Sequence, residues 1–262
     1  MHVSSWRWAA LAVIVALAGC SGSGSGSASD HPRRKASTTT TSSSTQPPTT
    51  TTTRPVVRAP RPVPPPTTAP APVFVGTVTA VDPATAARMT NVSWHPGCPV
   101  PPADLRLLHV SFHGFDGRMH VGVMAVSGRW ATAIVGVFHR LFDLGFPIQR
   151  MQLVDDYGGS DDLSVQANNT SAFNCRPVTG GSGFSRHAYG TAIDVNPQQN
   201  PYVNADGGTE HANAQVYLNR GLQAPGMIHA GDPVVAAFAS IGWRWGGYFT
   251  GAIDYQHFDT AP

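Results

Sequence analysis

SRHAYGTAID at residues 185–194 and DYQH at residues 254–257 are two short runs that are read together. The two runs place four side chains at short spacings among glycine and aromatic residues: His187, Asp194, Asp254 and His257. Two imidazoles and a carboxylate can complete a three-ligand zinc site that keeps its fourth position open for water. The second aspartate lies three residues before the last histidine, where it could act as a base towards that water. The pattern therefore predicts a hydrolytic zinc site.

The first twenty residues are typical of an exported protein. Arg7 supplies positive charge, and an apolar run over residues 9–18 is too short to span a bilayer comfortably. LAGC at residues 17–20 resembles the bacterial lipobox, in which the cysteine becomes the lipid-modified first residue. We expect residues 1–20 to be a lipoprotein signal peptide and Cys20 to anchor the chain to a membrane. The alternative is a secreted protein cut nearby, with Cys20 incidental.

The next segment has the composition of a linker. Residues 21–84 are rich in Ser, Thr and Pro, and their first fifty contain hardly an apolar side chain. Such a segment cannot bury enough surface to offset its ordering entropy, so we expect a disordered tether. Residues 85–262 suffice for one folded domain with a core. The formal net charge of +2 and the lack of a basic stripe give no reason to expect nucleic acid as a partner.

Two cysteines remain once Cys20 is assigned to lipid. In an exported protein the pair Cys98 and Cys175 favours one disulfide. The competing interpretation makes Cys175 a cysteine-peptidase nucleophile with His187, and it requires a free thiol.

The domain reads as α+β, a small antiparallel sheet with flanking helices. Glycines at 114 and 117 lie between two apolar runs and predict a hairpin. Apolar residues at helical spacing predict helices over residues 130–144 and 233–241. Further strands are predicted at residues 148–154 and 191–195, and residues 242–247 are predicted to form a turn and a strand. On a regular strand Asp254 and His257 would face opposite sides, so a local distortion must bring Asp254 to the metal's water.

SRHAYGTAIDVNP resembles the Ser-x-His-x-x-Gly-x-Ala-x-Asp signature of the zinc D-alanyl-D-alanine carboxypeptidase and L-alanyl-D-glutamate endopeptidase family. NNTSAFNCR at residues 168–176 looks like the family's arginine segment, and DYQHF looks like its acid-x-x-His ending. The resemblance covers about residues 95–259. It implies the fold that this family shares with lysostaphin-type peptidases and the hedgehog domain.

The resemblance also implies roles for single residues. Zinc would be held by His187, Asp194 and His257, with Asp254 as general base and later general acid. Arg176 would polarise the scissile carbonyl, and Ser185 would support the site from behind. Two departures are Asp254, where several relatives carry glutamate, and Asp259, which is either a supporting residue or only a surface one.

The expected function is hydrolysis of peptidoglycan stem peptides at the outer face of a bacterial cell membrane. D-Ala-D-Ala carboxypeptidase action is favoured over L-Ala-D-Glu endopeptidase action. A zinc-containing wall-binding module without turnover is the alternative from another class, and loss of hydrolysis but not of binding on Asp254→Ala would separate the two. A non-haem iron oxygenase also uses two histidines and a carboxylate, and metal analysis would identify it. Serine hydrolysis by Ser185 lacks a nucleophile elbow or oxyanion loop.

Overall fold

The computed structural model describes residues 72–261. Cys20, the predicted signal peptide and most of the predicted tether lie outside these residues. Within residues 72–261, no helix has the length and apolar character needed to cross a membrane.

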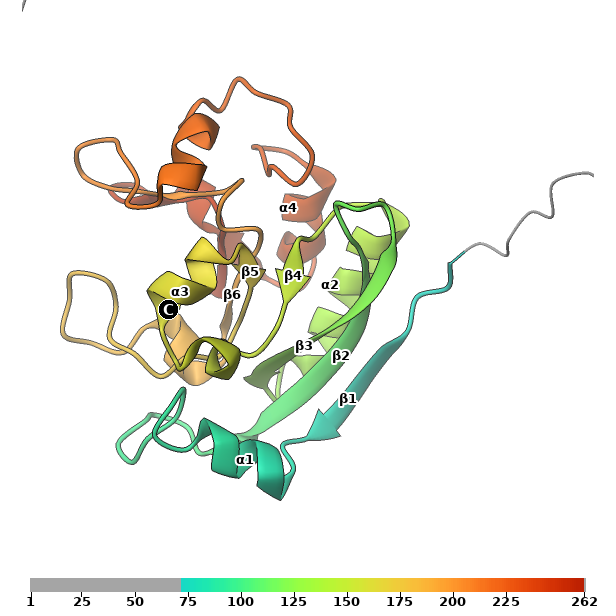
Figure 1. The fold of residues 1–262 in the computed structure, drawn as a ribbon, viewed down its shortest axis with the longest axis vertical. Coiled ribbons are helices and arrows are strands. Elements are labelled where there is room, and N and C mark those ends of the chain that lie inside the picture. Colours follow the sequence, from blue (N-terminus) through green and yellow to red (C-terminus); the bar gives the residue numbers. More distant parts are fainter. Residues whose placement is uncertain (1–71, 262) are drawn as a thin grey trace, which may run out of the picture. The chain divides into compact units, whose positions relative to one another are not determined.

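The predicted hairpin is the centre of the larger sheet (Figure 1). Strand β2 (Leu105–His113) pairs antiparallel with β3 (Met119–Ser127) over nine residue pairs. Side chains alternate across the strands, so that both faces carry apolar residues. Leu108 and Val110 face one cluster, whereas Leu105 and Leu107 face the other. The hairpin is therefore covered on both sides.

The sheet begins earlier in the chain than the sequence indicated. Strand β1 (Gly76–Ala80) pairs antiparallel with β2, from Gly76 opposite Val110 to Ala80 opposite Arg106. All five of its residues are exposed, so it has no alternating apolar pattern by which a strand is recognised. Helix α1 (Pro83–Met89) follows, capped by Asp82. Backbone pairing thus holds residues 76–80 in the sheet, although these residues lie within the segment 21–84 that the sequence assigns to the tether.

Helix α2 (Ala131–Asp143) covers one face of this sheet and is the predicted helix, shortened by one residue at each end. It buries an apolar stripe: Ile134, Val137, Phe138, Leu141 and Phe142. Helix α4 (Pro233–Ala239), the second predicted helix, packs against α2 and also against the smaller sheet. These two helices thus join the hairpin and the smaller sheet through one apolar core.

The smaller sheet has the order β6-β10-β8 and is antiparallel. Its strands are β6 (Ala192–Asp194), β10 (His257–Thr260) and β8 (Trp243–Trp245). Two further pairs have two residues per strand: β4 (Arg150–Met151) with β5 (Asn169–Thr170), and β7 (Tyr202–Val203) with β9 (Ile253–Asp254). The described residues thus form an α+β domain, as predicted.

Short helices complete the described part of the chain. Helix α3 (Asp161–Gln166) begins at Ser160, whose side chain accepts a hydrogen bond from the backbone of Leu163. The sequence does not predict this helix, because six residues are too few to show a helical period. The 3-10 helices are Pro102–Asp104, Val154–Tyr157, Arg186–Tyr189, Ala212–Leu218 and Gly246–Tyr248. The strand predicted over residues 148–154 is reduced to β4 because a 3-10 helix starts at Val154.

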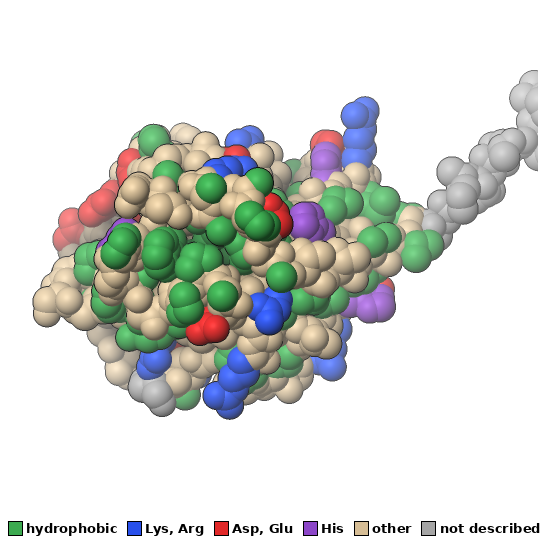
Figure 2. Space-filling model, turned by 90° about the horizontal axis from the view of Figure 1, so that it is seen from below, with side chains coloured by type: hydrophobic (Ala, Val, Ile, Leu, Met, Phe, Trp, Pro, Cys, Tyr) green, Lys and Arg blue, Asp and Glu red, His purple; other side chains and the backbone are tan. Residues whose placement is uncertain are grey.

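Charged side chains are unevenly spread on the face shown in Figure 2. Acidic side chains gather at its left edge, basic side chains are scattered over its upper edge, middle and lower edge, and hydrophobic side chains lie among them. No continuous basic strip crosses this face of the described residues.

Candidate active site

The three predicted ligands meet in the structure. His187 Nε2 lies 3.1 Å from Asp194 Oδ2, and His257 Nδ1 lies 3.0 Å from Asp194 Oδ1. The two ring nitrogens, His187 Nε2 and His257 Nδ1, are 3.2 Å apart. All three side chains are almost fully buried. One ligand atom from each residue is therefore close enough to the others to hold a single metal ion.

The smaller sheet sets two of these positions. Asp194 ends β6 and His257 begins β10, and the antiparallel register places the two residues directly opposite each other. Opposed residues on neighbouring strands bring their Cβ atoms to within about 5.5 Å. A carboxylate and an imidazole in that relation can reach one ion without distortion of the sheet.

His187 is delivered by the 3-10 helix that precedes β6. Ser185 caps this helix, and its hydroxyl accepts a hydrogen bond of 3.3 Å from the backbone N–H of His187. Gly190 ends the helix in the left-handed region, with φ at 66°. A Cβ at Gly190 would lie 2.5 Å from the backbone nitrogen of Ser127, so only glycine fits. The motif spacing thus sets the path of the chain around the ligand.

The outer nitrogens of both histidines are also held. His187 Nδ1 lies 2.6 Å from the carbonyl oxygen of Ala172. His257 Nε2 lies 3.7 Å from Asp259 Oδ2, and Asp259 accepts two hydrogen bonds from Arg244, at 3.0 and 2.9 Å. Such outer partners orient metal-binding imidazoles. Asp259 is buried at 3% exposure, which removes the surface interpretation of this residue.

Charge is concentrated on the ligand group. Burial alone would raise the pKa of Asp194, but His187 and His257 outweigh it and hold that pKa well below its usual range. Burial would lower the pKa of His257, yet its contacts with Asp194 and Asp259 raise it to about 10. The donor set of two imidazoles and one ionised carboxylate is one that zinc accepts. The residues present therefore fit the metal that the sequence predicted.

Asp254 approaches the ligands through a turn. β9 ends at Asp254, Tyr255 and Gln256 form a turn, and β10 starts at His257. This break supplies the distortion that the sequence required. Asp254 Oδ1 is buried and has no hydrogen-bond partner among the described residues. Burial, with a smaller effect from the charge of Asp194, raises the pKa of Asp254 to about 7.

Arg176 lies on the same cleft. Its Nη2 is 2.9 Å from Asp161 Oδ2 in α3, while its Nε is buried with no partner among the described residues. Arg176 and Asp254 both line a cavity of about 260 Å³ that also contains His187, Ser185 and His257, here called the metal-side cavity. A guanidinium on this cavity can donate hydrogen bonds to a substrate carbonyl.

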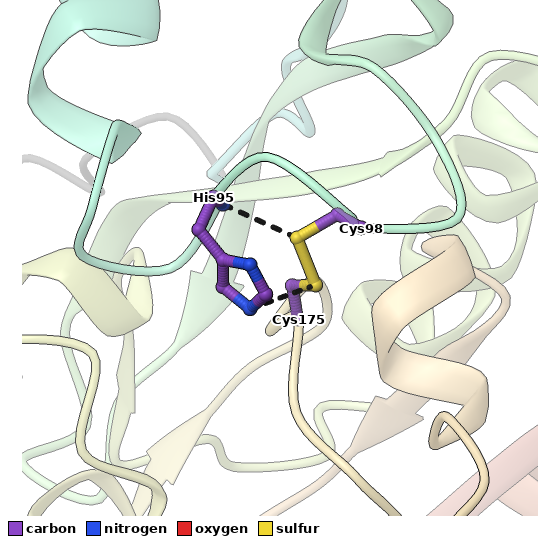
Figure 3. A group of neighbouring side chains, drawn as sticks. All are labelled: His95, Cys98 and Cys175. Atoms are coloured by element: carbon purple, nitrogen blue, oxygen red, sulfur yellow. Dashed lines mark hydrogen bonds between the residues drawn. A yellow bond between two sulfur atoms is a disulfide. The ribbon is translucent and has the colours of Figure 1, made fainter.

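Cys98 and Cys175 form a disulfide, as predicted, so Cys175 has no free thiol and the cysteine-peptidase alternative is excluded. His95 lies beside the bond (Figure 3). Its backbone N–H donates to Cys98 Sγ at 3.2 Å, and its Nε2 lies 3.6 Å from Cys175 Sγ. These three residues have the types of a metal site, but both sulfurs are used by the disulfide. The bond joins the loop after α1 to the residue before Arg176.

Some site residues gave no sequence signal. Asp161 was recognised only through its ion pair with Arg176, and Arg244 only through Asp259. Gln256 sits inside the DYQH motif, but a glutamine between two assigned residues carries no pattern of its own. Tyr202 lines the metal-side cavity from β7, eight residues after Asp194.

A family model described as D-alanyl-D-alanine carboxypeptidase matches residues 179–260. The matched residues contain the three ligands and Asp254, whereas Arg176 and Cys175 precede the match. No curated protein and no solved structure matches the chain.

Proposed function

Because residues 179–260 belong to the D-alanyl-D-alanine carboxypeptidase family, the chain is a peptidase, and we propose that it removes the terminal D-alanine from peptidoglycan stem peptides with the help of zinc. The observation that carries the proposal is the meeting of His187, Asp194 and His257 beside a buried, unpartnered carboxylate of Asp254. A group built only to bind zinc structurally would have no use for that carboxylate.

Each side chain has a chemical task in this proposal. His187 Nε2, Asp194 and His257 Nδ1 hold the ion, which supplies a Lewis acid for water and carbonyl when bound. Asp254 accepts a proton from the attacking water and later donates it to the leaving amine. A pKa near 7 suits both directions of that transfer. Arg176 donates hydrogen bonds to the carbonyl oxygen as negative charge develops on it.

The place of action is also part of the proposal. A lipid on Cys20 would hold the chain at the outer face of a bacterial cell membrane, and the Ser-, Thr- and Pro-rich segment after Cys20 would tether the domain. Roughly fifty residues could extend to about 150 Å, enough to reach wall or precursor peptides outside the membrane. Changing Cys20→Ala tests this: the protein should move from the membrane fraction to the soluble envelope fraction. Retention at the membrane would argue against the anchor.

The test of activity is digestion of defined stem peptides by zinc-loaded protein, with product masses. A peptide ending in D-Ala-D-Ala should release D-alanine as the free amino acid and leave a product that is shorter by that one residue. Release of an L-alanine-ended fragment instead would identify the endopeptidase alternative. Treatment with a chelator should abolish either product, and zinc should restore it.

Two variants separate catalysis from binding. Asp254→Ala should reduce hydrolysis by about 10²–10⁴-fold while zinc remains bound. Asp143→Asn, an exposed carboxylate of α2, is the matched control and should hydrolyse like the unchanged protein. If the protein binds the stem peptides but cuts none of them, the domain is a zinc-containing wall-binding module, and the proposal fails.

A further inference from the structure

A second cavity of about 110 Å³, here called the polar pocket, opens beside the metal-side cavity. Four residues line both spaces: Arg176, Thr179, Tyr202 and Asp254. One substrate could therefore occupy both cavities, with its reacting bond at the proposed metal ligands and another of its groups in the polar pocket. The side chains that line only the polar pocket indicate what that group is.

Gln256 is a buried polar residue of this pocket. The residue is 7% exposed, and its Oε1 is buried without a hydrogen-bond partner among the described residues. Its backbone is fixed, because its carbonyl oxygen accepts a 2.9 Å hydrogen bond from Val195 N–H. An unsatisfied buried amide oxygen costs about 1–3 kcal/mol. Such a cost is offset when a ligand supplies the missing donor.

The charges around Gln256 indicate what kind of donor fits. Asp161 and Glu210 line the polar pocket, and Arg176 is its single guanidinium, already paired with Asp161 at 2.9 Å. His211 also lines the pocket, and the Asp162 carboxylate lies 3.8 Å from its ring. Carboxylates thus outnumber the one arginine. A terminal carboxylate would be repelled here, whereas a cation would be attracted.

We propose that the polar pocket binds the side-chain ammonium group of a diamino acid residue in the peptide substrate, with Gln256 Oε1 and the Glu210 carboxylate accepting its hydrogen bonds. An ammonium group has three donors and no acceptor, which matches an amide oxygen and a carboxylate. The proposal rests on the peptidase function and names the substrate residue that this chain selects.

The experiment compares three peptides that end in D-Ala-D-Ala and differ in the preceding residue: lysine, norleucine and Nε-acetyl-lysine. Norleucine has the lysine carbon chain without the ammonium group, and the acetylated residue keeps the length without the charge. Zinc-loaded protein should cleave the lysine peptide with a kcat/KM about tenfold above that of either other peptide.

Variants assign this preference to the pocket. Gln256→Met and Glu210→Gln should each reduce the ratio of lysine to norleucine cleavage to below about threefold, whereas Gln256→Glu should increase it. Asp143→Asn, outside the pocket, should keep the ratio of the unchanged protein. The thermal midpoint of Gln256→Met should not fall, because the buried amide oxygen that it loses has no partner among the described residues.

Equal cleavage of the three peptides would overturn the inference and leave the peptidase function standing. If no peptide is cleaved, the proposed function fails, and calorimetry with zinc-loaded Asp254→Ala decides the inference by binding. The lysine peptide should then bind about tenfold more tightly than the norleucine peptide. Equal dissociation constants, or no binding of either peptide, would overturn it.

Discussion

Asp254 combines deep burial with a free oxygen. Its Oδ1 has no partner among the described residues, and its pKa is raised to about 7 from an ordinary value of 3.8. A carboxyl group with a raised pKa favours the folded state while protonated and opposes it once ionised. The contribution is therefore fully present below about pH 3.8 and is lost as the pH rises through 7.

Asp254→Asn should remove this loss in metal-free protein. Asparagine keeps the shape of the side chain and does not ionise. The thermal midpoint of the variant, relative to that of the unchanged protein, should therefore increase as the pH rises from 4 to 7. Melting curves recorded in chelator across that range measure the difference. Parallel pH profiles for the two proteins would show that Asp254 does not carry the raised pKa.

Asp259 is the residue whose role the sequence left open. Its carboxylate stands between His257 and Arg244, and those contacts lower its pKa although burial acts in the opposite direction. Motif spacing in the sequence marks the proposed ligands and Asp254. The contact between Asp259 and Arg244 could not be predicted, because it depends on the pairing of β10 with β8.

Asp259→Asn should weaken zinc binding about 10- to 100-fold, since His257 loses the partner of its outer nitrogen. Competition against a chelator of known affinity gives the dissociation constant. Asp156→Asn is the matched control, because it breaks an exposed pair with Arg88 elsewhere in the domain. Equal losses in the two variants would refute a specific role for Asp259.

At the scale of elements, length decides what could be predicted. The hairpin and α2 have nine to thirteen residues and show their period clearly. β9 has two residues, and its pairing with β7 joins segments about fifty residues apart. No local sequence pattern specifies such a pair. The proposed role of Asp254 requires a break in the strand, but the position of the turn could not be predicted from the sequence.

Gly246 packs closely against the backbone of Asp254, at the end of β9. A Cβ at this position would lie 2.3 Å from the carbonyl oxygen of Asp254, so Gly246→Ala must displace β9. We expect kcat to fall by at least about tenfold, since a displacement of about 1 Å can cost 10²-fold. Gly136→Ala in α2 is the control, because its Cβ would meet nothing within 4 Å. A kcat of Gly246→Ala equal to that of the control would exclude the displacement.

At the scale of the domain, the disulfide joins two distant segments of the chain within the smaller apolar cluster. Cys98 follows α1, and Cys175 lies 77 residues later, next to Arg176. The pairing could be predicted because only two cysteines remain in the domain. The sheet order β6-β10-β8 could not, because three short strands from distant segments leave no sequence pattern.

Replacing both cysteines by alanine should lower the free energy of unfolding by about 2–4 kcal/mol, because a 77-residue separation leaves a long loop unconstrained in the unfolded chain. Urea unfolding of the double variant and of the unchanged protein measures the difference. A reducing agent should destabilise the unchanged protein and leave the variant unaffected. Insensitivity of the unchanged protein would contradict the bond.

The two ligand histidines present different ring nitrogens to the site, and this has a consequence for their protons. His187 turns Nε2 inwards and directs Nδ1 to the carbonyl of Ala172, whereas His257 turns Nδ1 inwards and directs Nε2 to Asp259. In the neutral form needed for metal binding, the two rings must therefore be opposite tautomers. Nitrogen-15 spectra of the zinc-loaded protein should contain one histidine protonated at Nδ1 and one at Nε2. Within one site, a different neighbour thus determines which ring nitrogen carries the proton in each imidazole.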